Sequence, residues 1–320
     1  MATRDDTAAT SVDFVEEIDR VTLPEPVADL AADYETVFGD RDRFLWQWIY
    51  SLFPEFTLSS VADDHADHVR TQKTVLTMYV TILDDLVETH DDRESFEEAR
   101  KLAAGTATAD PARASVDPDQ FAFVERVWET FADGIADAPR REEFADILAY
   151  DLRQTTNAMD YSAVLNGHPT IANLDGARRY DSHNMVMFPY SDVDLMYSPA
   201  FDLAEFGALR DLLWDLQELA RIGNWLTTWK REIREGDYTA GVVVEALQEG
   251  IVTPDRLRHP EEAIEQIKDH GIEERFRRRW RERYRSVQSR GYDAASIDLD
   301  ALVDGMATVF EYHMASRGHK

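Results

Sequence analysis

The sequence predicts an all-α protein, and three observations lead to that prediction. Glycine and proline are sparse, with 14 and 11 residues in a chain of 320. The long stretches between them carry apolar residues at spacings of three and four, the period of an amphipathic helix, without the alternation of a strand. Hydrophobic residues make up 44% of the chain and aromatic residues 11%, enough for a sizeable core. We predict one compact helical domain over residues 25–320 and a flexible polar tail over residues 1–24.

Turn signals divide the periodic stretches into eleven predicted helices and no strand. None of the turns is long enough to be an interdomain linker. The predicted helices cover residues 26–38, 41–53, 62–89 and 93–104 before the turn at 105–111; 117–136 and 140–165 before His168-Pro169; 172–195 before Ser198-Pro199; 202–234 and 239–249 before Thr253-Pro254; and 259–289 and 295–316 in the last part of the chain.

Two predicted helices are apolar on every side. The helix over residues 62–89 contains VLTMYVTIL, and the helix over residues 202–234 contains LRDLLWDLQELARIGNWLTTW. A helix on the surface would show a polar face, so we expect these two to cross the middle of the molecule. Polar residues on them are therefore the first candidates for a functional site.

The composition excludes several classes of partner and chemistry. The 34 basic and 63 acidic residues give a net charge of −29, which repels nucleic acid and anionic lipid surfaces. Without cysteine the chain has no thiol nucleophile and no cysteine-based metal site. The first residues lack the apolar stretch of a signal peptide, and no apolar run is long enough to span a bilayer. We expect a cytoplasmic protein that does not insert into membranes.

The excess of acidic over basic residues also indicates the kind of cytoplasm in which the protein works. Only five of the basic residues are lysine, and acidic, lysine-poor chains suit a cytoplasm rich in salt. High ionic strength screens the self-repulsion of such a charge. We predict a halophilic protein.

The first candidate for chemistry is the sequence Asp84-Asp85-Leu86-Val87-Glu88, at the end of the first apolar helix. Asp84 and Glu88 are four residues apart and project from one helix face, where carboxylate oxygens can hold a hard divalent cation. Other Asp-Asp pairs in this chain are read as solvated surface. The nearly apolar run before this pair distinguishes it from them.

The second candidate is a column of oxygen ligands on the second apolar helix. Asn224, Thr228 and Glu232 follow each other at steps of four residues, so an amide, a hydroxyl and a carboxylate share one helix face. Such a donor set is typical of a magnesium site. Lys230 and Arg231 lie beside the column and could face an anionic ligand.

A third candidate is the pair Arg178-Arg179. It lies on a predicted helix that Gly176 weakens and that Asp181 and Ser182 could interrupt. Guanidinium groups bind phosphate oxygens with two hydrogen bonds, which complements two magnesium sites. A lone arginine pair is more often a surface feature.

Together these residues resemble the microbial class I terpene synthases, of bacterial or archaeal type, over about residues 40–317. Asp84, Asp85 and Glu88 match the family's aspartate-rich motif DDxx(D/E). Asn224, Thr228 and Glu232 match its second motif, (N/D)xxx(S/T)xxxE. The resemblance implies an all-α helical bundle of the class I terpenoid synthase fold around a central active-site cavity.

The resemblance also implies roles for the basic residues and for a helix break. Arg178 matches the position of the diphosphate sensor, and Asp181 and Ser182 match the linker and effector at the break. Lys230, Arg231 and Arg317 would bind diphosphate. Two departures from the family pattern are Trp225, where an aspartate is usual, and the ending Ser316-Arg317-Gly318, where the family has Arg-Tyr.

The function implied is a magnesium-dependent lyase that ionises an allylic isoprenyl diphosphate and cyclises the resulting carbocation. Three Mg²⁺ ions are expected, with Mn²⁺ as a substitute, and farnesyl diphosphate is favoured over geranylgeranyl diphosphate as substrate. Homodimers occur in the family. A dry pocket with aromatic faces is required, and its candidates are Trp48, Phe53 and Tyr79, with Trp46, Tyr50 and Phe56 nearby.

Three other readings are open. A helical metal phosphohydrolase of the HD type could use His65, His68, His90 with Asp91, and His183, but it leaves the Asn224 column unexplained. An isoprenyl chain-elongating synthase would carry a second DDxxD motif, whereas this chain has Asn224, Thr228 and Glu232 at that place, which disfavours elongation. An acidic helical binding protein without catalysis would expose Asn224, Thr228 and Glu232 to solvent, whereas a cyclase would gather them around a cavity.

Overall fold

The computed structural model describes residues 14–105 and 107–318, and within these ranges it contains helices and no strand. The all-α prediction is confirmed. The helices of the first half are α2 (Glu25–Val37), α3 (Arg43–Leu52), α4 (Ala66–Glu88), α5 (Arg93–Ala104), α6 (Pro118–Gly134) and α7 (Arg141–Gly167). Those of the second half are α8 (Leu174–Arg179), α9 (Met187–Met196), α10 (Phe206–Glu235), α11 (Gly241–Gln248), α12 (Pro254–Leu257), α13 (Pro260–Asp269), α14 (Ile272–Gln288) and α15 (Leu299–Ala315).

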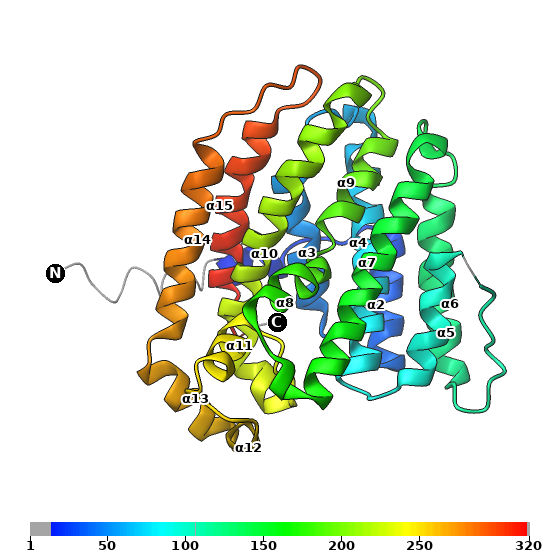
Figure 1. Ribbon diagram of the computed structural model, residues 1–320. Coiled ribbons are helices and arrows are strands. Elements are labelled where there is room, and N and C mark those ends of the chain that lie inside the picture. The colour runs from blue at the N-terminus through cyan, green and yellow to red at the C-terminus, as the bar shows by residue number, and fades with distance from the viewer. Residues whose placement is uncertain (1–13, 106, 319–320) are drawn as a thin grey trace.

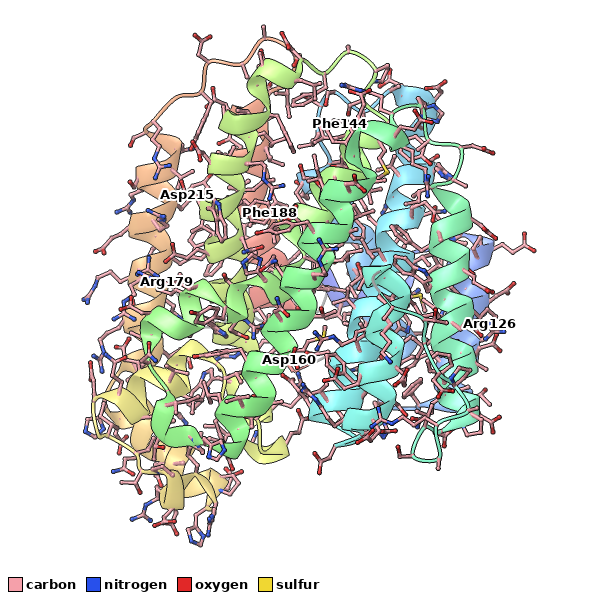
Figure 2. All side chains as sticks on the ribbon, turned by 45° about the vertical axis from the view of Figure 1, so that its right-hand side comes forward. Arg126, Phe144, Asp160, Arg179, Phe188 and Asp215 are labelled. Carbon is pink, nitrogen blue, oxygen red and sulfur yellow. The ribbon has the colours of Figure 1, made fainter. Side chains whose placement is uncertain are left out.

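The long helices stand side by side, with α4 and α10 in the interior (Figure 1). Helix α4 packs against α5, α6 and α7, and α10 packs against α14 and α15. Both carry buried side chains along most of their length, as the two apolar stretches of the sequence predict. Asp215 of α10, labelled in Figure 2, forms an ion pair with Arg283 of α14.

Short local signals fix where the helices begin and end. The side chains of Asp42, Asp92 and Asp298 accept hydrogen bonds from backbone N–H groups in the first turns of α3, α5 and α15. These caps satisfy donors that have no partner inside the helix. Helix α10 is followed by Gly236, whose φ of 85° is a left-handed conformation that glycine adopts without strain and that ends the helix.

Two of the predicted helices are divided in the structure. The predicted helix 172–195 becomes α8, a 3-10 turn η4 (Asp181–Met185) and α9. The predicted helix 259–289 becomes α13 and α14, because Gly271 takes a left-handed φ of 65° between them. An apolar period that continues through a break conceals it, and the glycine is the signal that marks the second one.

The tail prediction is wrong for residues 14–24, while residues 1–13 lie outside the described residues. Residues 14–19 are helical, and the side chains of Ile18 and Leu23 are 3% and 4% exposed. Gln47 on α3 donates hydrogen bonds to the carbonyls of Asp19 and Val21 and ties the segment to the bundle. Ile18 and Leu23 of this acidic segment both pack into the hydrophobic core.

Candidate functional site

A cavity of about 240 Å³ lies inside the bundle and is lined by residues of α3, α4, α9, α10 and α15. On α4 the lining residues Thr77, Thr81, Asp84 and Glu88 form one stripe at helical spacing. From Thr77 to Glu88 this stripe rises by about 16 Å. The cavity therefore runs along α4, and its polar end coincides with the C-terminal end of that helix.

The two ends of the cavity differ in chemistry. We call the polar end the mouth and define it by Asp84, Glu88, Glu232 and Asp237; exposed residues such as Thr89 also line the cavity at this end. We call the other end the floor and define it by the aromatic rings that line it, which are those of Phe53, Phe56 and Tyr190. A charged mouth above an apolar floor suits a ligand with an ionic head and a hydrocarbon tail.

Asp84 and Glu88, predicted from the first motif, both line the mouth. Oδ1 of Asp84 is buried and has no hydrogen-bond partner. Burial and the neighbouring charge of Asp85 raise the pKa of Asp84 to about 7. Burial, followed by the charge of Asp237, raises the pKa of Glu88 well above its usual range. These carboxyl groups lie close enough to repel one another, and none of the described residues donates a hydrogen bond to Oδ1 of Asp84.

Asp85 has different surroundings from its neighbour and does not line the cavity. Its Oδ1 accepts hydrogen bonds from Nε and Nη2 of Arg41 at 3.1 and 2.6 Å, and its Oδ2 accepts one from the hydroxyl of Tyr34 at 2.6 Å. Arg41 does line the mouth. Of the three residues of the first motif, two therefore face the cavity and the third holds an arginine that faces it.

All three residues of the second motif line the cavity from α10, so the predicted column is present. The amide oxygen of Asn224 accepts a hydrogen bond from Arg221 at 2.8 Å, and the hydroxyl of Thr228 donates to the backbone carbonyl of Asn224. Oε2 of Glu232 is buried without a partner. Burial, followed by the charge of Asp237, raises the pKa of Glu232 to about 7.

Four charged residues at the cavity are absent from the sequence prediction, namely Arg41, Arg221, Glu235 and Asp237. Arg221 is buried and binds both carboxylate oxygens of Asp181 at 2.7 and 2.6 Å. It stands three residues before Asn224, a spacing that places both on one helix face, so the sequence did contain a signal for it. Asp237 lies in the turn after α10, between two predicted helices, where periodicity predicts nothing. Arg41 is the first residue of the predicted helix 41–53, but in the structure it lies in the turn before α3, where the helix period assigns it no face.

Only one of the four predicted diphosphate-binding residues, Arg231, lines the cavity. Lys230 and Arg317 instead meet at Glu273 of α14, with distances of 3.3 and 2.9 Å. Arg178 is exposed and forms an ion pair with Glu218 outside the cavity. Its neighbour Arg179 is exposed as well (Figure 2). The spacing that selects Arg178 does not determine which way its side chain points.

The predicted helix break is present, and both of its predicted residues are buried. Asp181 binds Arg221 and accepts a further hydrogen bond from the indole N–H of Trp225 at 3.2 Å. Ser182 donates a hydrogen bond to the carbonyl of Arg178. After the turn, Val186 takes a φ of 57°, a strained conformation for a β-branched residue, and lines the cavity. The break thus connects α8 on the outside to the cavity wall.

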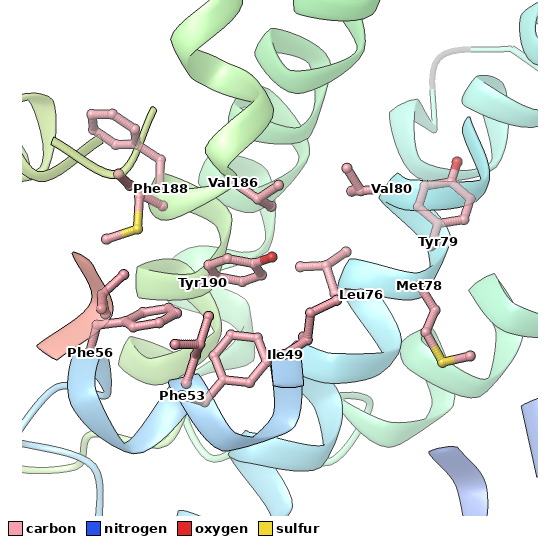
Figure 3. Close-up of a cluster of buried hydrophobic side chains, with 14 of the residues drawn as sticks. Ile49, Phe53, Phe56, Leu76, Met78, Tyr79, Val80, Val186, Phe188 and Tyr190 are labelled. Atoms are coloured by element: carbon pink, nitrogen blue, oxygen red, sulfur yellow. The ribbon is translucent and has the colours of Figure 1, made fainter. Parts of the chain in front are cut away.

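The aromatic predictions are correct for Trp48 and Phe53, which line the cavity, and wrong for Tyr79. The hydroxyl of Tyr79 donates to the carbonyl of Ala99 on α5, and the residue is completely buried. Figure 3 shows Tyr79 on the far side of α4 from Phe53 and Tyr190. The apolar face of α4 extends around the helix, so the sequence alone does not separate the cavity side from the core side.

A divalent metal ion fits the residues at the mouth by donor chemistry. Among the described residues no group of three or more acidic or histidine side chains is close enough to hold an ion ready-made. The available donors are nevertheless oxygens, the type that Mg²⁺ prefers, and they include the unpartnered buried oxygens of Asp84 and Glu232. Asp84, Glu88, Glu232 and Asp237 could hold such ions, with Asn224 and Thr228 beside them.

The histidines of the phosphohydrolase reading do not converge. His65 and His68 lie at the start of α4 and His90 lies just after its end, so the 23 residues of this helix separate them by about 30 Å. His68 contacts the hydroxyl of Tyr197, and His90 contacts Asp40. A metal site made of these residues is incompatible with this fold.

Comparison with known proteins gives no family. No protein-family model matches the chain, and no significant match was found among curated proteins. In the part of the chain that the structure describes, no helix combines the length and the apolar character needed to cross a membrane.

Proposed function

We propose that this protein is a class I terpene cyclase that releases diphosphate from an allylic isoprenyl diphosphate and cyclises the carbocation. One observation carries the proposal: side chains of the two motifs, whose first residues are 224 − 84 = 140 positions apart, line one cavity that ends in an aromatic floor. Carboxylates for metal ions and a dry pocket are the two requirements of this chemistry. Asn224, Thr228 and Glu232 line a cavity and none of them is exposed, which argues against a non-catalytic acidic binding protein.

The mouth would bind the diphosphate and its metal ions. Asp84, Glu88, Asn224, Thr228 and Glu232 would hold Mg²⁺. When bound, these ions neutralise the charge that develops on the leaving diphosphate. Arg41 and Arg231 line the same end of the cavity and supply positive charge for the remaining phosphate oxygens.

The floor and walls would take the hydrocarbon chain. When the allylic carbon–oxygen bond breaks, its electron pair leaves with the diphosphate and the positive charge remains on carbon. The apolar walls exclude water, and the aromatic face of Trp48, which also lines the cavity, attracts the cation. The reaction ends when a carbon–hydrogen bond gives its electrons to a new double bond and releases a proton, or when water adds to the cation.

The test is product formation by the purified protein. We expect incubation with farnesyl diphosphate, then with geranylgeranyl diphosphate, in high salt with magnesium, to give a cyclic hydrocarbon or alcohol by gas chromatography with mass detection. EDTA and the substitution Asn224→Ala should abolish it. Asp211→Asn, an exposed carboxylate on the same helix, serves as the matched control and should keep activity. Absence of product from both substrates with a folded protein would refute the proposal.

A further inference from the structure

A buried ion pair lies directly behind the cavity floor. Nζ of Lys73 is 3.0 Å from both carboxylate oxygens of Asp194, and both residues are completely buried. Lys73 continues the α4 stripe one turn below Thr77, and neither member of the pair lines the cavity. The ammonium group also donates to the carbonyl of Phe56 and the hydroxyl of Thr57 at 3.3 Å. Its hydrogen-bonding capacity is therefore fully used.

The same ammonium group faces all three rings of the floor. Nζ lies 5.0 Å from the ring centre of Phe53, 5.1 Å from that of Phe56 and 6.0 Å from that of Tyr190. These distances are within the range of a cation–π interaction. The rings form one group, in which Phe53 contacts both Phe56 and Tyr190 (Figure 3). The floor therefore already interacts with a positive charge of the protein itself.

The ion pair also connects the elements that carry these rings. Phe53 and Phe56 belong to the 3-10 turn η1 (Phe53–Phe56), and Lys73 bonds to the end of that turn. Tyr190 is on α9, one turn before Asp194. Oδ2 of Asp194 also accepts a hydrogen bond from the backbone N–H of Leu58, just beyond η1. The pair thus fixes η1 and α9 relative to α4.

Stability alone does not explain such a pair. Replacing a buried ion pair by apolar residues of similar size is often neutral or stabilising, because both charges lose their hydration in the interior. Burial lowers the pKa of Lys73 and raises the pKa of Asp194, and their mutual attraction opposes both shifts. An electrostatic effect on the rings of the floor, in contrast, requires a charged group behind them.

We propose that the Lys73–Asp194 ion pair is a specificity-determining pair that keeps positive charge away from the cavity floor, so that the floor accepts only the uncharged end of a ligand. The ammonium is the member of the pair that faces the rings, and rings that already interact with one cation attract a second one less. A neutral hydrocarbon end is unaffected. In the proposed reaction, on which this consequence rests, the carbocation would be stabilised nearer the mouth.

The test compares two amphiphiles that differ only at the tail, dodecyl phosphate and 12-(trimethylammonio)dodecyl phosphate, by calorimetry with magnesium. We expect the wild-type protein to bind the uncharged tail about 100-fold more tightly. The double variant Lys73→Met/Asp194→Leu should reduce this ratio at least tenfold. Lys73→Gln/Asp194→Asn, which keeps polar groups and removes both charges, should act in the same direction, and circular dichroism reports whether each variant folds.

The matched control is Arg210→Met/Asp151→Leu. It removes another ion pair between helices, which lies outside the cavity lining, and should leave the ratio unchanged. A ratio that stays constant in a folded charge-free variant overturns the inference, as does a wild-type protein that binds neither amphiphile. The assay needs no turnover, so a changed ratio without product from either farnesyl or geranylgeranyl diphosphate would refute the proposed cyclase while the role of the ion pair stands.

Discussion

Asp84 and Asp85 are adjacent in the chain, yet their surroundings give them different tasks. Oδ1 of Asp84 is buried at the mouth without a partner, whereas both oxygens of Asp85 accept hydrogen bonds from Arg41 and Tyr34. A helix turns by about 100° per residue, so neighbours on it point in different directions. In this chain the second aspartate positions an arginine, and the first is available to a cation.

Substitution of the two aspartates should separate these tasks. We expect Asp84→Asn to lower the kcat of the proposed reaction by about 100-fold or more, because it removes a negative charge that would hold a cation. Stability should change little, since Oδ1 of Asp84 has no hydrogen-bond partner among the described residues. Asp85→Asn should lower stability by about 2–4 kcal/mol, since it leaves Arg41 without its buried partner. Steady-state kinetics and chemical denaturation measure the two effects. Equal loss of kcat with unchanged stability in both variants would contradict the distinction.

Glu273 should give the protein a pH-dependent contribution to stability. Burial raises the pKa of Glu273, but the charges of Arg317, Arg277 and Lys230 outweigh it and lower that pKa to about 2. The ionised form is therefore favoured by folding. The stabilisation, on the order of 3 kcal/mol, is present above the ordinary pKa of about 4.5 and is lost as the pH falls from there towards 2.

The corresponding measurement is urea denaturation of wild type and Glu273→Gln across this pH range. The difference in unfolding free energy should be largest at neutral pH and should shrink below about pH 4. Glu274→Gln is the neighbouring control, because its exposed ion pair with Arg281 should contribute less than about 1 kcal/mol. A difference that is independent of pH would show that the effect of Glu273 is not electrostatic.

At the scale of elements, close contacts decide which helices can meet at the cavity. Helix α15 packs against the turn η1, and a Cβ atom at Gly305 would lie 1.8 Å from the backbone carbonyl oxygen of Glu55. The glycine permits this approach. The turn that carries Phe53 and Phe56 is therefore held in place both by α15 and by Lys73 on α4.

Two glycine substitutions test this contact. We expect Gly305→Ala to destabilise the protein by about 2 kcal/mol or more, because the new methyl group collides with backbone that cannot move aside alone. Gly207→Ala on α10, where a Cβ would meet nothing within 4 Å, should be neutral or stabilise by up to about 1 kcal/mol. Thermal unfolding of both variants is the measurement. A stable Gly305→Ala variant would mean that α15 and η1 pack less closely.

At the scale of the whole molecule, the net charge of −29 acts on every element together. Repulsion among surface carboxylates opposes the compact state, and it is screened over a Debye length that shortens from about 10 Å at 0.1 M salt to about 3 Å at 1 M. Many arginines already pair with carboxylates between helices, such as Arg275 with Glu249 and Arg234 with Glu261. These exposed pairs weaken in salt, so the two effects oppose each other.

We expect the global repulsion to dominate. The Tm should therefore rise when potassium chloride is increased from about 0.1 M to about 2 M. Differential scanning calorimetry in this range measures the effect. A parallel series with sucrose, which strengthens apolar burial without screening charge, separates charge screening from a general strengthening of burial. A Tm that is unchanged or falls in potassium chloride would contradict the prediction of a halophilic protein.

The sequence by itself determined the helical class and most helix positions, because the apolar period and the breakers are local properties. It also placed Asp84, Glu88 and the Asn224 column on the correct helix faces, since four-residue spacing fixes a face. Only the tertiary structure decided that these faces share one cavity and that Tyr79 and Arg178 point elsewhere. It alone brought Arg41 to the cavity and Lys73 behind its floor, because which faces meet depends on packing between segments far apart in the chain.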